Sequence, residues 1–437
     1  MTDVSLIFEV HQPIRLHKHG VKRSSPDIEG RYFSDHFNKF VFDKVARNCY
    51  YPATEILLNL VDDMKNEKKP FKVAFSITGL WLEQCERLHP DLVDMFASFP
   101  RNRVEFLDET YYHSLTGLFE DKGQFIEDIK EHREAIKSYF GYEPQVFTNT
   151  ELIYNNAIAK VAQEAGYKAV FTEGVDRILG WRSPNYVYRP PSYISDIKIL
   201  LRNRRLTDDV GYRFSTREWN EWPLTAEKHT SWIAASPGQC VNLFMDYETF
   251  GEHHWEGTGI FWFLRAFPYQ INRWANLNFS LPHEIIERHQ PMGEYDVFEM
   301  NTISWADLEM DVSAWLGNDM QKRYFDELKK MLPAVKQTGD PELMRVWKIM
   351  QTSDHLHNVC TKWWGDGDVH QYFSYFDHPQ QGFSTIADII FDFKERVYEK
   401  LMEGRRLKTE GVTDTFQPSA PSVKDVEKKA QGKKENV

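Results

Sequence analysis

Cysteine is scarce in this chain, and its few copies form no recognisable motif. Four cysteines occur among 437 residues, far apart and without a CxxC spacing, at Cys49, Cys85, Cys240 and Cys360. This distribution excludes a disulfide framework and a cysteine-based zinc site. It predicts free thiols in a reducing compartment.

Excess positive charge and long apolar runs are also missing. The formal net charge is −12 and the isoelectric point is near 5.8, which argues against binding to nucleic acid or to an anionic membrane. No apolar run is long enough to span a membrane, and the N-terminus lacks the basic and apolar segments of a signal peptide. We therefore expect a soluble, cytoplasmic protein with no nucleic-acid or membrane partner.

Several motifs of common enzyme classes are absent. The chain contains no GxGxxG or P-loop glycine pattern, which disfavours a nucleotide-binding fold. It has no HExxH motif and no compact His/Asp set, as a metal-dependent hydrolase requires. The GxSxG motif of serine hydrolases is missing as well.

Short apolar segments alternate with segments of helical periodicity. One clear amphipathic helix covers Phe125–Phe140 and ends at Gly141, and another covers Asn155–Ala165 before Gly166. Such alternation predicts a parallel sheet, and about seven units by residue 250 favour a barrel one strand short of eight. An open doubly wound sheet is the alternative. The predicted strands are Val4–Val10, Phe71–Thr78, Val104–Leu107, Gln145–Thr150, Ala169–Thr172, Ile197–Arg202 and Val241–Met245.

The pattern changes after residue 255. Helical periodicity dominates there, and the predicted helices are Ile260–Trp274, Asp319–Met331, Glu342–Met350 and Ala387–Glu403. From residue 405 the chain is rich in Lys, Glu, Pro, Ser and Gln, a composition typical of disorder. We expect a barrel over residues 1–256, a helical domain over 257–404 and a disordered charged tail over 405–437.

Carboxylates follow most of the predicted strands. The predicted strand Val241–Met245 leads into Asp246, Glu248 and then His253. The predicted strand Gln145–Thr150 leads into Glu151 in the same way. In a parallel barrel all these strand ends lie on one face, where such folds build their active sites. A single carboxylate there is more often a loop residue or a helix cap, but the set favours function. The other rim residues are Glu9, Asp108, Glu109, His113 and Glu173.

Two convergent carboxylates are what glycoside cleavage requires. One protonates the departing oxygen, and the other attacks the anomeric carbon or activates water. Aromatic residues make up 14% of the chain, and rings that lie beside polar residues suit stacking against sugars. Most of these rings are nevertheless expected to serve core packing.

Five segments carry a resemblance to glycoside hydrolase family 57, over roughly residues 4 to 400. The family comprises α-amylases, 4-α-glucanotransferases, branching enzymes and amylopullulanases. The similar segments are His11–Pro13, Val104–Leu115, Phe147–Glu151, Asp246–His253 and Asn301–Gln321. The Asp246–His253 run, and Thr352–Asp354 ahead of Trp363 and Trp364, resemble the α-amylase-like branch.

The resemblance implies an incomplete (β/α)7 TIM-like barrel followed by a C-terminal helical domain, with a retaining mechanism. It implies that Glu151 is the nucleophile and Asp246 the general acid, with carboxyl groups about 5–5.5 Å apart. No metal or organic cofactor is expected, and the expected partner is an α-glucan or maltooligosaccharide. The candidate substrate-binding residues are His11, Gln12, His113, Glu248, His253, Trp305, Asp307 and Asp354.

Several activities remain open from the sequence. The first is α-amylase-type hydrolysis of α-1,4-glucans, with 4-α-glucanotransferase or branching activity as the alternative on the same site. The others are a metal-dependent polysaccharide deacetylase on a similar barrel and a non-catalytic glucan-binding protein. Oligomeric state has no signature in the sequence.

Overall fold

Seven parallel strands form the centre of the molecule in a computed structural model that describes residues 1–362 and 374–413, with side chains to residue 404. All seven predicted strands are present, with ends shifted by at most two residues. Their order around the sheet is β3-β2-β1-β7-β6-β5-β4. The strands are β1 (Thr2–Val10), β2 (Val73–Ile77), β3 (Val104–Leu107), β4 (Val146–Thr148), β5 (Ala169–Glu173), β6 (Lys198–Arg202) and β7 (Cys240–Asp246).

The two ends of this sheet meet and nearly close a barrel. Asp108, just beyond β3, donates its backbone N–H to Val146 O at 3.0 Å and accepts from Thr148 N at 2.8 Å. These contacts join β3 to β4, the first and last strands of the order. The fold is therefore the predicted incomplete (β/α)7 barrel, and the open doubly wound alternative is wrong.

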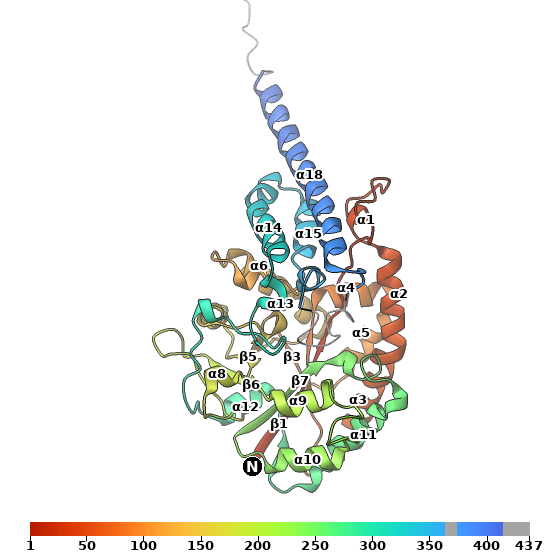
Figure 1. Cartoon of the computed structure of the whole chain (residues 1–437). Helices are drawn as coiled ribbons and strands as arrows, with labels where there is room; N and C mark the ends of the chain where they lie inside the picture. Colours follow the sequence, from red (N-terminus) through yellow and green to blue (C-terminus); the bar gives the residue numbers. More distant parts are fainter. Residues whose placement is uncertain (363–373, 414–437) are drawn as a thin grey trace, which may run out of the picture.

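Helices surround the strands, as Figure 1 shows. Helix α6 ends where Gly141 adopts φ +59°, the left-handed conformation predicted for that glycine. Helix α4 begins at Thr78, whose hydroxyl accepts from Trp81 N. The helices in this half are α1 (Glu29–Tyr32), α2 (Asp35–Val45), α3 (Tyr51–Asp63), α4 (Gly79–Leu88), α5 (Pro90–Ala97), α6 (Gly123–Phe140), α7 (Asn156–Glu164), α8 (Asp176–Leu179), α9 (Arg204–Gly211) and α10 (Ala226–Ala235).

The second half of the chain is helical apart from one short strand that the sequence did not indicate. Strand β8 (Leu277–Phe279) pairs with the first residues of β1, and α11 (Ile260–Arg273) packs on α3 and α10. Strand β8 and α11 therefore still pack on the barrel elements, although they follow residue 256, where the sequence predicts the domain boundary. Three residues are too few for a visible period-2 pattern, which is why β8 was missed.

The remaining helices gather above one end of the barrel (Figure 1). They are α13 (Ser313–Leu316), α14 (Asp319–Thr338), α15 (Pro341–Ile349), α16 (Ser353–His357) and α18 (Pro379–Thr413), whereas α12 (Pro282–Arg288) lies at the opposite end, where Arg288 pairs with Asp3 of β1. Helix α14 continues through Pro333, beyond the end predicted at Met331, and its buried Met331 and Val335 lie on either side of that proline. Packing of α14 against α18 and α15 compensates for the backbone hydrogen bond that a proline removes.

The last helix also extends further than predicted. Helix α18 reaches Thr413, so the boundary placed at residue 405 falls inside a helix. Residues 414–437, the rest of the predicted tail, lie outside the described residues, as does the Trp363–Trp364 segment. The described residues contain no helix with the length and apolarity that a membrane crossing needs. None of the four cysteines forms a disulfide, as predicted, and all four are buried.

Side-chain alternation along the strands explains why acidic groups reach the barrel interior. In β1, Leu6 and Phe8 pack outward in the main core, whereas Ile7 packs in the separate cluster inside the barrel. Because successive side chains on a strand point to opposite faces, Glu9 shares the inner face with Ile7. Asp246 is the register partner of Glu9 on the parallel neighbour β7 and lies on the same face.

Candidate active site

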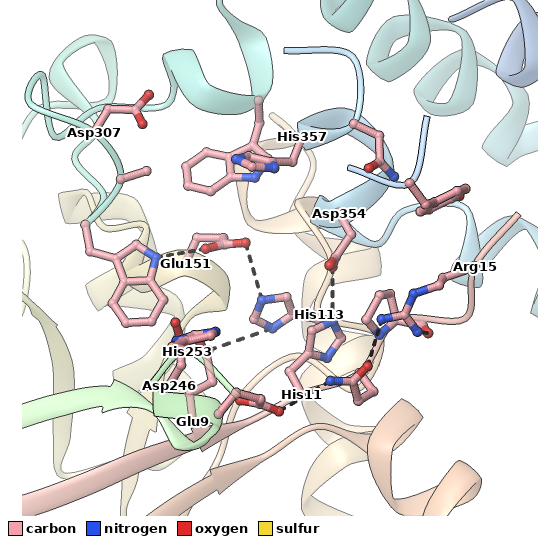
Figure 2. A pocket seen from close by; sticks show the side chains of 18 of the residues that line it. Glu9, His11, Arg15, His113, Glu151, Asp246, His253, Asp307, Asp354 and His357 are labelled. Atoms are coloured by element: carbon pink, nitrogen blue, oxygen red, sulfur yellow. Dashed lines mark hydrogen bonds and ion pairs between the residues drawn. The ribbon is translucent and has the colours of Figure 1, made fainter. Parts of the chain in front are cut away.

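All ten predicted site residues line one cavity of about 210 Å³ at the carboxyl ends of the strands. Figure 2 shows Glu151, Asp246, His11 and His113 from the barrel beside Asp354 from α16. The ten residues are Glu151, Asp246, His11, Gln12, His113, Glu248, His253, Trp305, Asp307 and Asp354. The cavity therefore lies between the barrel and the helical region.

Glu151 is held in place by donors from three segments. It lies in a short 3-10 turn, η3 (Thr150–Leu152), after β4, with φ +58°, a left-handed conformation that is costly for a non-glycine residue. Trp305 Nε1 donates to its Oε2 at 2.8 Å, Ser353 Oγ donates to its Oε1 at 2.8 Å, and His113 Nε2 lies 3.5 Å from Oε1. Burial would raise the pKa of Glu151, but the hydrogen bond and charge of His113 and the Trp305 donor outweigh burial and lower it.

Asp246 ends β7, and its pKa is shifted in the opposite direction to that of Glu151. Burial, reinforced by the negative charge of Glu151, raises the pKa of Asp246 to about 7. The buried guanidinium of Arg202 acts in the other direction. Arg202 itself is fixed by Glu173 Oε2 at 2.8 Å and Asp208 Oδ1 at 2.5 Å. Asp246 therefore keeps a proton at a pH where Glu151 is ionised.

The two predicted sugar-binding histidines contact protein groups through both ring nitrogens. His11 Nδ1 lies 2.9 Å from Thr78 Oγ1, and its Nε2 lies 3.0 Å from Asp354 Oδ2. The ring of His113 stacks on that of His11 with a centroid distance of 4.1 Å. Direct sugar contacts from these two rings remain a prediction.

A chain of polar contacts runs along the other wall of the cavity. Arg15 donates to Gln12 Oε1 at 2.8 Å, and Gln12 Nε2 donates to Glu248 Oε1 at 3.4 Å. The hydroxyl of Tyr50 also donates to Glu248. Burial raises the pKa of Glu248 to about 8, so this carboxyl is neutral at pH 7. Glu248 is therefore suited to binding or support and not to nucleophilic attack.

The remaining predicted residues also line the cavity. Burial lowers the pKa of His253 to about 4, so its ring is uncharged at neutral pH. Asp307 Oδ2 pairs with Lys362 Nζ at 3.1 Å. The Trp305 ring lies 5.7 Å from the Arg202 guanidinium and meets Phe244 nearly edge-on. Its predicted stacking against sugar remains a prediction.

Three of the rim carboxylates named from the sequence lie outside the cavity lining. Asp108 is fully buried and contacts His132, Tyr167 and Arg133. Glu109 accepts from Ser76 Oγ at 2.7 Å and faces His113. Glu173 pairs with Arg202. These three groups do not face the cavity. Glu109 contacts His113 and Glu173 contacts Arg202, and both of these partners act on the two predicted catalytic carboxyls.

Several lining residues were missed by the sequence reasoning. Arg15 follows the His11–Pro13 motif by two residues, so its proximity was detectable. Tyr212 comes from the segment after α9, and nothing in its neighbourhood marks it as a site residue. The missed lining residues include Arg15, Tyr212, His357, Asn358 and Tyr375, whereas Glu9 was named among the rim residues, and Pro13 and Trp315 lie in two of the five similar segments.

One group of described residues has the donor types for a metal ion. Glu9, Glu109 and His113 each offer one ligand atom, and these atoms lie within 4.8 Å of one another. The Nδ1 atom of His113 already lies 3.3 Å from Glu109 Oε2. A metal ion would have to replace that hydrogen bond.

Comparisons with known proteins agree with this architecture. The family model described as "Glycosyl hydrolase family 57" matches residues 5–298. A protein of Methanocaldococcus jannaschii described as "Putative alpha-amylase" is 46% identical over 407 residues, which cover 91% of this chain and 85% of that protein.

Solved structures share the fold at low sequence identity. A branching enzyme from Pyrococcus horikoshii superposes with a TM-score of 0.64 at 12% identity, over 88% of each chain. A 4-alpha-glucanotransferase from Thermococcus litoralis superposes with a TM-score of 0.55 at 18% identity. That match covers 82% of this chain and 51% of the glucanotransferase, so this chain spans about half of its length.

Proposed function

Because the chain belongs to glycosyl hydrolase family 57, we propose that it hydrolyses α-1,4-glucans with retention of configuration, as an α-amylase does. It is a glycoside hydrolase by family, and the specific activity is the proposed part. The relative that is 46% identical bears an α-amylase description, which supports hydrolysis of starch, glycogen or maltooligosaccharides.

Glu151 and Asp246 divide the chemistry between them. In the first step Glu151 attacks the anomeric carbon, the glycosidic bond breaks, and the leaving oxygen takes the proton of Asp246. In the second step Asp246 removes a proton from water, the water oxygen attacks the anomeric carbon, and Glu151 leaves as a carboxylate. We expect the two carboxyl groups to lie about 5–5.5 Å apart in the productive complex.

The opposite pKa shifts of the two carboxyls are the observation that carries this assignment. The donors around Glu151 lower its pKa, while burial raises the pKa of Asp246 to about 7. A nucleophile must be ionised and a general acid protonated at the same pH, and environments that separate two pKa values in this way identify the two roles. Trp305 and Ser353 come from the region beyond the barrel, so the helical part completes the site.

Two variants test the roles. Glu151→Gln and Asp246→Asn should each reduce turnover of maltooligosaccharides by at least about 10⁴-fold with an unchanged fold, because each removes a group essential to a chemical step. On a glycoside with an activated leaving group, Asp246→Asn should retain the first step, since that group departs without a proton. Glu151→Gln should stay inactive on both substrates. Near-normal turnover by Glu151→Gln would overturn the assignment.

Product analysis separates the related activities. Incubation with maltoheptaose should give glucose and shorter chains with an initially retained α-anomer, measured by chromatography and proton NMR. Longer chains would instead indicate a 4-α-glucanotransferase, and new α-1,6 linkages a branching enzyme. Binding without any product would indicate a glucan-binding protein.

A further inference from the structure

His113 lies at the centre of a group of buried carboxylates. Its Nδ1 atom is 3.3 Å from Glu109 Oε2 and 3.9 Å from Glu9 Oε1, while its Nε2 atom is 3.5 Å from Glu151 Oε1. The side chain of His113 is only 3% exposed. Figure 2 shows its ring between Glu151 and Glu9. Each nitrogen thus faces an acidic oxygen.

The backbone around His113 fixes the orientation of this ring. His113 has φ +49°, a left-handed conformation that a non-glycine residue adopts only when its surroundings enforce it. Its N–H donates to Thr110 O at 3.1 Å, and its carbonyl accepts from Ser353 N at 2.9 Å. The hydroxyls of Thr110 and Thr150 lie 2.6 Å apart. These contacts tie the His113 loop to the Glu151 turn and to α16.

We propose that His113 is a positioning residue that stays a cation throughout the reaction, with Glu109 as its permanent counter-ion and Glu151 as its working partner. This inference rests on the proposed retaining mechanism. Before attack, the cation keeps Glu151 ionised and oriented. After attack, His113 continues to donate to the carbonyl oxygen of the glycosyl ester.

The charge balance of the reaction explains why a further carboxylate is needed. Formation of the ester removes the negative charge of Glu151, and Asp246 gains one when it gives up its proton. The proton on His113 does not move in either step. Without Glu109, the imidazolium would lose its remaining counter-ion at the ester stage and would release its proton in a buried site.

Oxygen Oε1 of Glu151 already faces two donors, Ser353 and His113, whereas within the described residues Oε2 accepts from Trp305 alone. Oε2 faces fewer hydrogen-bond donors and is therefore the oxygen better placed to attack the anomeric carbon. Oε1 becomes the ester carbonyl oxygen, and the same two donors remain on it. They stabilise the carboxylate that re-forms as the second step proceeds.

The charges around His113 support this assignment. Burial would lower the pKa of His113, but Glu9, Glu109 and Glu151 together raise it well above its ordinary value. The hydrogen bond and charge of His113 outweigh burial and lower the pKa of Glu109, whereas burial raises the pKa of Glu9 well above its ordinary value, so Glu109 is the ionised counter-ion. The stacked His11 has a lowered pKa, because of burial and the charge of His113, and remains neutral. The titratable groups that face His113 are Glu9 on β1, His11 after it, Glu109 after β3, Glu151 in η3, Asp246 on β7 and Asp354 on α16.

The first test replaces the cation with a neutral residue that can adopt the left-handed backbone conformation of position 113. Asparagine tolerates the left-handed conformation better than most residues, so His113→Asn is the suitable variant. The acid limb of its kcat/KM profile should move up by about one pH unit. At a pH below the acid limbs of both the variant and the unchanged protein, kcat/KM should therefore be about tenfold lower in the variant. The loss should fall on kcat more than on KM, because Glu151 and not glucan binding is affected. An acid limb that does not move would overturn the proposal.

The second test removes a counter-ion. In Glu109→Gln, His113 should release its proton at a lower pH, so activity should fall at a lower alkaline pH than in the unchanged protein. Combined with His113→Asn, the Glu109 change should add little, because both act through the same charge. The matched control is Glu105→Gln on the same segment. Glu105 is equally buried but pairs with His283 at 2.9 Å, so its variant should keep both limbs in place.

Direct observation of the imidazole completes the test. Histidine-labelled protein should show His113 doubly protonated by ¹⁵N NMR between pH 5 and pH 8. A neutral His113, or a stoichiometric divalent metal that elemental analysis finds in the purified protein and not in His113→Asn, would overturn the proposal. An active Glu151→Gln would instead overturn the retaining mechanism itself, so the two failures are distinguishable.

Discussion

Trp305 donates its indole N–H to Oε2 of Glu151 at 2.8 Å, although 154 residues separate the two in the chain. The contact connects the region beyond the barrel to the proposed nucleophile. Trp305→Phe keeps an aromatic ring and removes only the donor. A hydrogen bond to a charged group contributes about 1.5–3 kcal/mol, so kcat/KM should fall by about 10- to 100-fold.

The acid limb of the Trp305→Phe profile should also move to higher pH, because the lost donor helps to lower the pKa of Glu151. Trp315→Phe is the matched control. Trp315 lines the same cavity, and within the described part of the chain its buried indole N–H has no hydrogen-bond partner. An equal loss of activity in both variants would show that ring shape matters and the hydrogen bond does not.

The pH dependence of the unchanged protein should have two limbs that belong to different carboxyls. As pH falls below the lowered pKa of Glu151, the nucleophile is protonated and activity is lost. As pH rises through about 7, the pKa of Asp246, the general acid loses its proton and activity is lost again. The alkaline limb should vanish in Asp246→Asn assayed on an activated glycoside. Its persistence there would assign that limb to another group.

Arg202 should be important for stability as well as for the site. Its guanidinium is buried between Glu173 and Asp208, so Arg202→Met leaves two acidic groups without their cation. Loss of one partner of a buried pair costs about 3–5 kcal/mol, measurable as a lower free energy of unfolding in urea. The pKa of Asp246 should rise as well, because Arg202 normally lowers it.

Arg189→Met is the comparison for Arg202→Met. The Arg189 side chain is 40% exposed and lies 3.7 Å from Glu294 and 4.0 Å from Asp196. An exposed pair contributes less than about 1 kcal/mol. Similar destabilisation by both variants would contradict the role given to the buried network.

Glu248→Gln should alter how stability depends on pH. Burial raises the pKa of Glu248 to about 8, so between about pH 4.5 and pH 8 the folded state holds a proton that the unfolded state has released. Stability therefore falls as pH rises through this window. The variant cannot ionise, and its free energy of unfolding should decline less between pH 5 and pH 8. A decline equal to that of the unchanged protein would show that Glu248 is ionised in the fold.

The strand pattern was predictable because each barrel strand is apolar over several residues and ends at a polar group. That pattern located β1, β4 and β7, and with them Glu9, Glu151 and Asp246. Strand β8 was not predictable, because three residues show no period, and the continuation of α14 through Pro333 was hidden because packing there outweighs local preference. The sequence also suggested sugar binding for His11 and His113 without indicating their protein partners.

The sequence by itself determined which residue types arrive at the rim, since alternation along each strand fixes which side chains face the barrel interior. Tertiary structure decided the protonation states of those groups and their distances from one another. Burial and neighbouring charges set the proton on Asp246, remove it from Glu151 and place His113 between three carboxylates. These effects depend on distances between residues up to some 240 positions apart in the chain, such as Ser353 and Glu151, or His113 and Ser353. No local pattern encodes such distances, because electrostatic interaction follows separation in space and not in sequence.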